Sequence, residues 1–129
     1  AGLRVGYSVC SPLIADFINR VREPFNVNYT AQVAAIAALS DDDHLKDSVE
    51  VNTKGYEQLT QGFDSLKLKY IPSHANFIAV EFNNAMSIYN DLLKQGVIVR
   101  PVEMIGYLRI SIGTSDENEH LLRALKKVL

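Results

Sequence analysis

The chain has 129 residues, of which 47% are hydrophobic and 22% are charged, so its composition is that of an ordinary globular domain that can bury a core. Its formal charge at pH 7 is only -2, and no run of basic residues supplies the footprint of a nucleic-acid or anionic-membrane surface. We therefore expect neither nucleic acid nor a membrane as a partner.

Residues 33–39 form the longest apolar run, which is too short to span a bilayer. Cys10 is the single cysteine and cannot form an internal disulfide, which is typical of a reducing compartment, so we expect a cytoplasmic protein. Its place at the end of an apolar string favours a small buried hydrophobe over a reactive thiol. The chain opens on Ala-Gly-Leu-Arg without a methionine, and we interpret it as a piece of a longer protein.

The first predicted element is a strand over residues 3–10. Alternation along it places Arg4 on the same face as Gly2 and Gly6, so the guanidinium has small neighbours and a ligand can approach closely. Ser11-Pro12 then predicts a helix start, and the helix ends before Pro24 because a proline disfavours helical angles in the residue before it.

Asn28 or Thr30 can cap a second, alanine-rich helix that runs to about residue 39. The acidic string at 41–43 marks another helix start, where capping is favoured over metal binding because consecutive residues of a helix point in different directions. This third helix, over 41–64, has a narrow apolar stripe typical of a long linking helix.

After residue 65 the pattern alternates between strand and helix. Strands are predicted at 68–71, 77–82, 97–99 and 107–112, and helices at 85–95 and after the capping box at 114–117. The result is an α/β fold with a small β-β-α-β-β-α unit. We expect three segments, with residues 1–40 as part of a domain that is otherwise missing, 41–64 as the linking helix and 65–129 as a self-contained α/β unit.

In the strand 107–112, Leu108 and Ile110 should face the core while Arg109 and its neighbours Tyr107 and Ser111 face the opposite way. A second planar cation besides Arg4 suggests a ligand with two anionic groups, although two solvated strand arginines would fit the same pattern. The three histidines at 44, 74 and 120 have no metal-ligand spacing, so we expect no metal.

Five strings in order resemble the C-terminal region of the histidinol-phosphate aminotransferases, a subfamily of the fold type I, class II pyridoxal-phosphate aminotransferases. They are Ala-Gly-Leu-Arg-Val-Gly-Tyr at 1–7, Arg-Glu-Pro-Phe-Asn-Val-Asn at 22–28, Ala-Asn-Phe at 75–77, Gly-Val-Ile-Val-Arg-Pro at 96–101 and Leu-Arg-Ile-Ser-Ile-Gly-Thr at 108–114.

The resemblance implies a homodimeric enzyme of histidine biosynthesis that moves an amino group between glutamate/2-oxoglutarate and histidinol phosphate/imidazole-acetol phosphate with pyridoxal 5'-phosphate as cofactor. It implies that Arg4 contacts the cofactor phosphate, that Arg109 holds the glutamate carboxylate and the substrate phosphate in turn, and that Arg100 assists the phosphate. A bidentate guanidinium suits both anions. The resemblance further implies that the three expected segments are, in chain order, the end of a large cofactor domain, its link and a small C-terminal domain.

The same resemblance places the Schiff-base lysine a few residues upstream of Ala1, so the chain contains no catalytic residue of its own and we expect it to be inactive alone. Two alternatives remain open. One is a related pyridoxal-phosphate enzyme, either an aromatic aminotransferase or an amino-acid-phosphate decarboxylase. The other is a non-catalytic anion-binding module.

Overall fold

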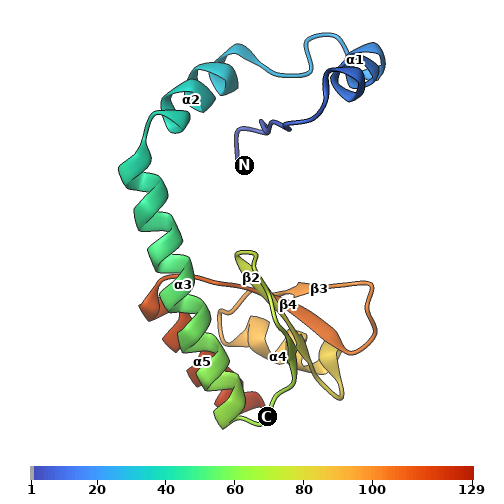
Figure 1. Ribbon diagram of the computed structural model, residues 1–129. Coiled ribbons are helices and arrows are strands. Elements are labelled where there is room, and N and C mark those ends of the chain that lie inside the picture. The colour runs from blue at the N-terminus through green and yellow to red at the C-terminus, as the bar shows by residue number, and fades with distance from the viewer. Residues whose placement is uncertain (1) are drawn as a thin grey trace. The chain divides into compact units, whose positions relative to one another are not determined.

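The computed structural model describes residues 2–129, so Ala1, the first residue of the 1–7 string and of the predicted segment 1–40, lies outside the described residues. The chain divides into two compact units, one ending at Leu45 and the other spanning Lys46–Leu129. Figure 1 shows the order of the elements from α1 to α5.

The first unit contains α1, Pro12–Val21, and α2, Tyr29–Leu39. Both helices begin where the sequence predicts. The Ser11 hydroxyl accepts from the Ile14 N–H at 3.5 Å, and the Asn28 side chain accepts from the Ala31 N–H at 2.8 Å. Of the two predicted caps for α2, Asn28 is therefore the one used.

Apolar side chains of the first unit are largely exposed. No residue of α1 is buried, and Ala31 is the buried residue of α2. Exposed apolar surface of this extent is typical of helices that pack against further protein.

The predicted strand over 3–10 is wrong: after a turn at Gly2–Leu3, residues 4–10 have no regular structure. Arg4 has φ of 59°, in the left-handed region, which is incompatible with a continuous strand. A strand needs a hydrogen-bonded neighbour, and the sheet of the described residues lies entirely in the second unit, between residues 70 and 111. Cys10 is consequently exposed, so its interpretation as a buried hydrophobe is also wrong.

Helix α3, Asp42–Ser65, is one long element as predicted, with bounds one residue later at each end. The Asp41 side chain accepts from the His44 N–H at 3.0 Å, so this aspartate caps the helix. Asp42 and Asp43 lie in the first turn, where the helix dipole favours negative charge.

The second unit contains a four-stranded antiparallel sheet in the order β1-β2-β4-β3. The strands are β1, Tyr70–Ile71; β2, Phe77–Glu81; β3, Arg100–Pro101; and β4, Tyr107–Ser111. The helices are α4, Ala85–Lys94, and α5, Ser115–Val128. The predicted β-β-α-β-β-α order is confirmed.

The third strand lies later than predicted. Residues 97–99 alternate as a strand would, with Val97 and Val99 buried and Ile98 85% exposed, but they have no ladder partner. Pairing with β4 occurs instead at Arg100 and Pro101. A proline is tolerated there because β3 is an edge strand and needs no donor on its outer side.

One face of the sheet is buried against helices. Alternate residues of β2 and β4, namely Ile78, Val80, Leu108 and Ile110, form the core with side chains from α3, α4 and α5. Figure 1 shows α4 behind the strands and α5 beside the lower end of α3. The other face of the sheet carries no helix from this unit, and period-two alternation therefore directs its polar residues outward.

Helix α3 approaches the end of β4 closely at Gly55. A Cβ built on Gly55 would lie 2.6 Å from Cγ2 of Ile112, 2.9 Å from Nδ2 of Asn118 and 3.0 Å from the carbonyl oxygen of Gly113. The buried Asn118 side chain fixes this loop, since it accepts from the Gly113 N–H at 2.9 Å and donates to Gln58 Oε1 at 3.2 Å.

We expect Gly55→Ala to change the free energy of unfolding by between about 0 and 2 kcal/mol in the destabilising direction, because overpacking against backbone and a hydrogen-bonded amide costs about 1–3 kcal/mol while the helix gains about 1 kcal/mol. Gly62→Ala is the matched control. A Cβ at Gly62 would meet the flexible end of the Leu122 side chain, which can move aside. Gly62→Ala should therefore keep the stability that alanine adds to a helix relative to glycine. Thermal unfolding of both variants makes the comparison, and equal midpoints would contradict the close contact at Gly55.

The capping box at the start of α5 is present as predicted. The Thr114 hydroxyl accepts from the Glu117 N–H at 3.4 Å, and Oε2 of Glu117 accepts from the Thr114 N–H at 2.8 Å and from its hydroxyl at 2.9 Å. These bonds, first from the Thr114 backbone and then from its side chain, hold the pKa of Glu117 below its ordinary value near 4.5.

A lowered folded-state pKa means that the Glu117 carboxylate contributes stability above about pH 4.5 and loses it as the pH falls through the folded-state value. We expect the free energy of unfolding of the parent chain to exceed that of Glu117→Gln at pH 7, and the difference to shrink below pH 4.5. Urea unfolding at a series of pH values measures it, and a difference that grows in acid would contradict the capping box.

Candidate functional site

The open face of the sheet in the second unit is the candidate site. Residues that face away from the core in β2 and β4 are Phe77, Ala79, Glu81, Tyr107, Arg109 and Ser111. Leu108 and Ile110, between them, are buried, as the sequence pattern predicts. Because its two neighbours in the strand are buried in the core, the side chain of Arg109 lies on the opposite, open face.

The register of β3 and β4 brings two predicted residues together. Arg100 and Arg109 are direct cross-strand partners, so both side chains leave the same face of the sheet. Direct partners in an antiparallel pair have Cβ atoms about 4.5–5.5 Å apart, and like charges in such positions repel. A pair of this kind is stabilised when an anion lies between the two guanidinium groups.

Within residues 2–129 no carboxylate forms an ion pair with either arginine. Glu81, on the same face, lies opposite Tyr107, one row away from the arginine pair. The positive charge of Arg100 and Arg109 is therefore not neutralised within the described part of the chain.

The Arg109 guanidinium lies over the ring of Phe77, with Cζ 4.7 Å from the ring centroid. Its Nε is buried and has no hydrogen-bond partner among the described residues. A buried donor without a partner costs free energy, which is recovered when an acceptor binds. Within the described part of the chain Arg109 therefore has an unsatisfied hydrogen-bond donor, an unusual feature that makes it the leading candidate for a functional role on this face.

Arg4 belongs to the first unit and is exposed. Neither Gly2 nor Gly6 would bring a Cβ within 4 Å of another atom, so the space around this turn is open. The small neighbours predicted from the sequence are present, although the backbone is a turn and not a strand.

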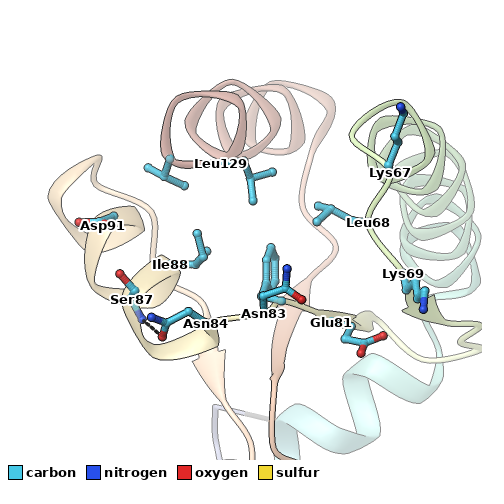
Figure 2. A pocket seen from close by; sticks show the side chains of 12 residues that line it. Lys67, Leu68, Lys69, Glu81, Asn83, Asn84, Ser87, Ile88, Asp91 and Leu129 are labelled. Carbon is cyan, nitrogen blue, oxygen red and sulfur yellow. Dashed lines mark hydrogen bonds between the residues drawn. The ribbon is translucent and has the colours of Figure 1, made fainter.

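A cavity of about 390 Å³ lies among the start of α4, the end of α5 and residues 67–69 (Figure 2). Its charged lining residues are Lys67, Lys69, Glu81 and Asp91, two of each sign. In Figure 2 the Asn84 side chain accepts a hydrogen bond from the Ser87 N–H, so Asn84 is the N-cap of α4. With balanced charge, this cavity has no preference for an anion, and neither Arg100 nor Arg109 lines it.

A second cavity, of about 630 Å³, lies where β3 stops pairing with β4. It is lined by residues 96–99 and 110–113 and by the first turns of α5, including Asp116 and Glu117. Its other polar lining residues include Asn118 and His120, and neither Arg100 nor Arg109 lines it.

Phe77 is the site residue that sequence reasoning missed. The string Ala-Asn-Phe contributes to the resemblance, but no role for the ring follows from it. The sequence does contain one signal: Phe77 and Ala79 are two residues apart in a strand, so their side chains lie on the same face. In the register of the sheet, Ala79 is the cross-strand partner of Arg109. Recognising the contact requires that register, which the sequence does not state.

The described part of the chain shows no group of three His, Cys, Asp or Glu side chains that could hold a metal ion. A search of the same residues for a helix long and apolar enough to cross a membrane finds none.

A small antiparallel sheet with helices on one face and an unneutralised arginine pair on the other defines an α/β domain whose open face is a candidate anion-binding surface. The chain belongs to the family of class I and II aminotransferases, since the sequence model of that family matches residues 1–125.

Over its whole length the chain is 52% identical to a histidinol-phosphate aminotransferase of Methylobacillus flagellatus and 51% identical to one of Moorella thermoacetica. It spans 36% and 34% of these relatives, about a third of their length. The crystal structure of histidinol-phosphate aminotransferase from Sinorhizobium meliloti, a complex with pyridoxal-5'-phosphate, matches with a TM-score of 0.85 at 29% identity, covering 98% of this chain and 37% of that one.

These matches confirm the resemblance found in the sequence and the α/β fold of a C-terminal aminotransferase segment.

The arginine pair predicts a stabilising effect of inorganic phosphate. At ten times its dissociation constant, a ligand that binds only the folded chain adds about 1.4 kcal/mol to the free energy of unfolding. We expect phosphate to raise the thermal midpoint at constant ionic strength, and Arg109→Ala or Arg100→Ala to abolish the increase.

Arg123→Ala is the matched control, because Arg123 is an exposed arginine on α5 that already pairs with Glu119 at 2.8 Å. It should keep the response to phosphate. A response that survives Arg109→Ala would show that the anion binds elsewhere.

Proposed function

We propose that this chain is the C-terminal segment of a pyridoxal-phosphate-dependent aminotransferase that transfers the amino group of histidinol phosphate to 2-oxoglutarate, giving imidazole-acetol phosphate and glutamate, so that histidinol phosphate and glutamate are the amino donors of the two directions. The observation that carries the proposal is the unneutralised Arg100–Arg109 pair, found in a chain 52% identical along its length to a histidinol-phosphate aminotransferase. Both donors carry an anionic group, and two guanidinium groups on one open face suit a carboxylate and a phosphate.

Arg109 binds a carboxylate of glutamate and, in the alternate half of the reaction, the phosphate of histidinol phosphate. The planar fork can donate two parallel N–H···O bonds to either anion. Arg100, directly across the strand pair, adds a second cation. A phosphate carries more charge than a carboxylate, so Arg100 assists the phosphate substrate.

Arg4 contacts the phosphate of the cofactor. The residues fit that role, since Arg4 is exposed, has open space beside Gly2 and Gly6, and forms no ion pair with a described residue. When bound, pyridoxal phosphate supplies the electron sink that amino transfer requires, while the chain supplies binding and orientation.

The segments 1–40, 41–64 and 65–129 correspond in this proposal to the end of a large cofactor domain, a linking helix and a small substrate-facing domain. The complete protein is proposed to be a cytoplasmic homodimer that uses 2-oxoglutarate as the acceptor of the amino group. The exposed apolar faces of α1 and α2 support burial of the first unit against further protein.

The test is an assay of the complete protein, with this segment at its C-terminal end, for transfer from histidinol phosphate to 2-oxoglutarate. Phenylalanine and histidinol serve as comparison donors, because the first lacks the phosphate and the second lacks any anionic group. A preference for phenylalanine would favour an aromatic aminotransferase, and carbon dioxide release from an amino-acid phosphate would favour a decarboxylase.

In the complete protein we expect Arg109→Ala to lower kcat/KM for glutamate and for histidinol phosphate together, because one fork serves both. Removing one member of a desolvated charge-assisted pair costs roughly 2–5 kcal/mol, or about 30-fold to several thousand-fold. Arg109→Lys should be nearly as harmful, since an ammonium cannot make the bidentate contact.

Arg100→Ala should impair histidinol phosphate more than glutamate, and steady-state kinetics with both donors measures the ratio. Arg123→Ala, an exposed arginine paired on α5, is the control and should leave both values unchanged. Equal losses for the two donors at Arg100 would refute its assignment to the phosphate.

A further inference from the structure

We propose that Phe77 is a positioning residue for substrate binding: its ring holds the Arg109 guanidinium in the orientation that receives the anionic group. The inference rests on the proposed role of Arg109 in substrate binding. It adds a residue that acts through Arg109 and does not itself bind the substrate anion.

The register of the sheet explains why the two side chains meet. Ala79 is the direct partner of Arg109 on β2, and Phe77 is the partner of Ser111, one row further along. Phe77 and Arg109 are therefore diagonal neighbours on one face, a spacing that aromatic and long side chains can bridge. The small Ala79 leaves the space above it free, so the arginine side chain can lean along the sheet onto the ring.

The contact suits a guanidinium in particular. Cζ of Arg109 lies 4.7 Å from the ring centroid of Phe77, well within the range of a cation–π interaction. An arginine is more weakly hydrated than a lysine and stacks on aromatic faces, so the ring replaces water beside the cation. The ring occupies one side of the guanidinium, and the buried Nε donor remains without a partner among the described residues.

The ring itself belongs to a well-anchored segment. Nδ2 of Asn52 on α3 donates to the Ala75 carbonyl at 3.4 Å, and the Ile112 N–H donates to the Asn76 carbonyl at 2.9 Å. The start of β2 is thus tied to α3 on one side and to the end of β4 on the other. A platform held in this way can restrict the rotamers of a long side chain packed on it.

Loss of the Phe77 ring should weaken binding of the amino donors more than it slows the catalytic step. In Phe77→Leu the guanidinium keeps its charge but loses the surface that orients it, so KM should rise for both amino donors by roughly fivefold to 30-fold, the range of a partly desolvated cation–π contact. The value of kcat should change much less, because the interaction is present in both the ground and transition states.

The experiment uses the complete enzyme with its cofactor and compares Phe77→Leu, Phe77→Tyr, Arg109→Ala and the double variant Phe77→Leu/Arg109→Ala. Phe77→Tyr keeps an aromatic face and should restore KM to within about twofold of the parent value. In the Arg109→Ala background, Phe77→Leu should have no further effect on KM, because the group it positions is absent.

Phe82→Leu is the matched control. Phe82 directly follows β2 but is buried in the core of the unit, so its truncation should lower the thermal midpoint without raising KM. If Phe77→Leu behaves like Phe82→Leu, or if its effect on KM adds fully to that of Arg109→Ala, the positioning role is refuted while the proposed function stands. If Arg109→Ala itself leaves KM unchanged for both donors, the site assignment fails and the inference fails with it.

Discussion

The cross-strand pairing of Arg100 with Arg109 is the constraint on which the rest of the candidate site depends. Two like charges at directly opposed positions are unfavourable in an isolated sheet, and natural sheets place opposite charges or apolar pairs there. The arrangement is compatible with a stable fold because the core lies on the other face and does not depend on this pair. Burial of Leu108 and Ile110 keeps the strand in place, while the open face carries the two cations to which we assign the substrate anions.

The elements that were predicted correctly are those whose signals are local. Ser11 and Asn28 cap their helices, the box of Thr114 and Glu117 opens α5, and alternation in β4 assigns Arg109 to the face opposite the core. Each depends on residues within a few positions of one another, so a single sequence contains the information. The pairing of Arg100 with Arg109 could not be predicted in this way, because register is a relation between strands.

The two incorrect strand predictions also arise because strand pairing depends on residues far apart in the sequence. Residues 3–10 alternate like a strand, but no neighbouring strand among the described residues completes their hydrogen bonds. Without such a neighbour, a segment of high β-propensity does not form a strand. Residues 97–99 also alternate, with Val97 and Val99 buried, yet the ladder forms one step later at Arg100 and Pro101. Periodicity thus predicted which side chains are buried around β3 more reliably than which backbone groups pair.

The two edges of the sheet restrict how this unit can associate with other chains. Each edge strand, β1 and β3, is only two residues long, and β3 consists of a charged residue and an imino acid that lacks a backbone donor. Neither edge offers a continuous row of free amides to template a further strand, which protects the unit against edge-to-edge aggregation. Contacts with other protein must therefore use the faces of its elements and not its strand edges.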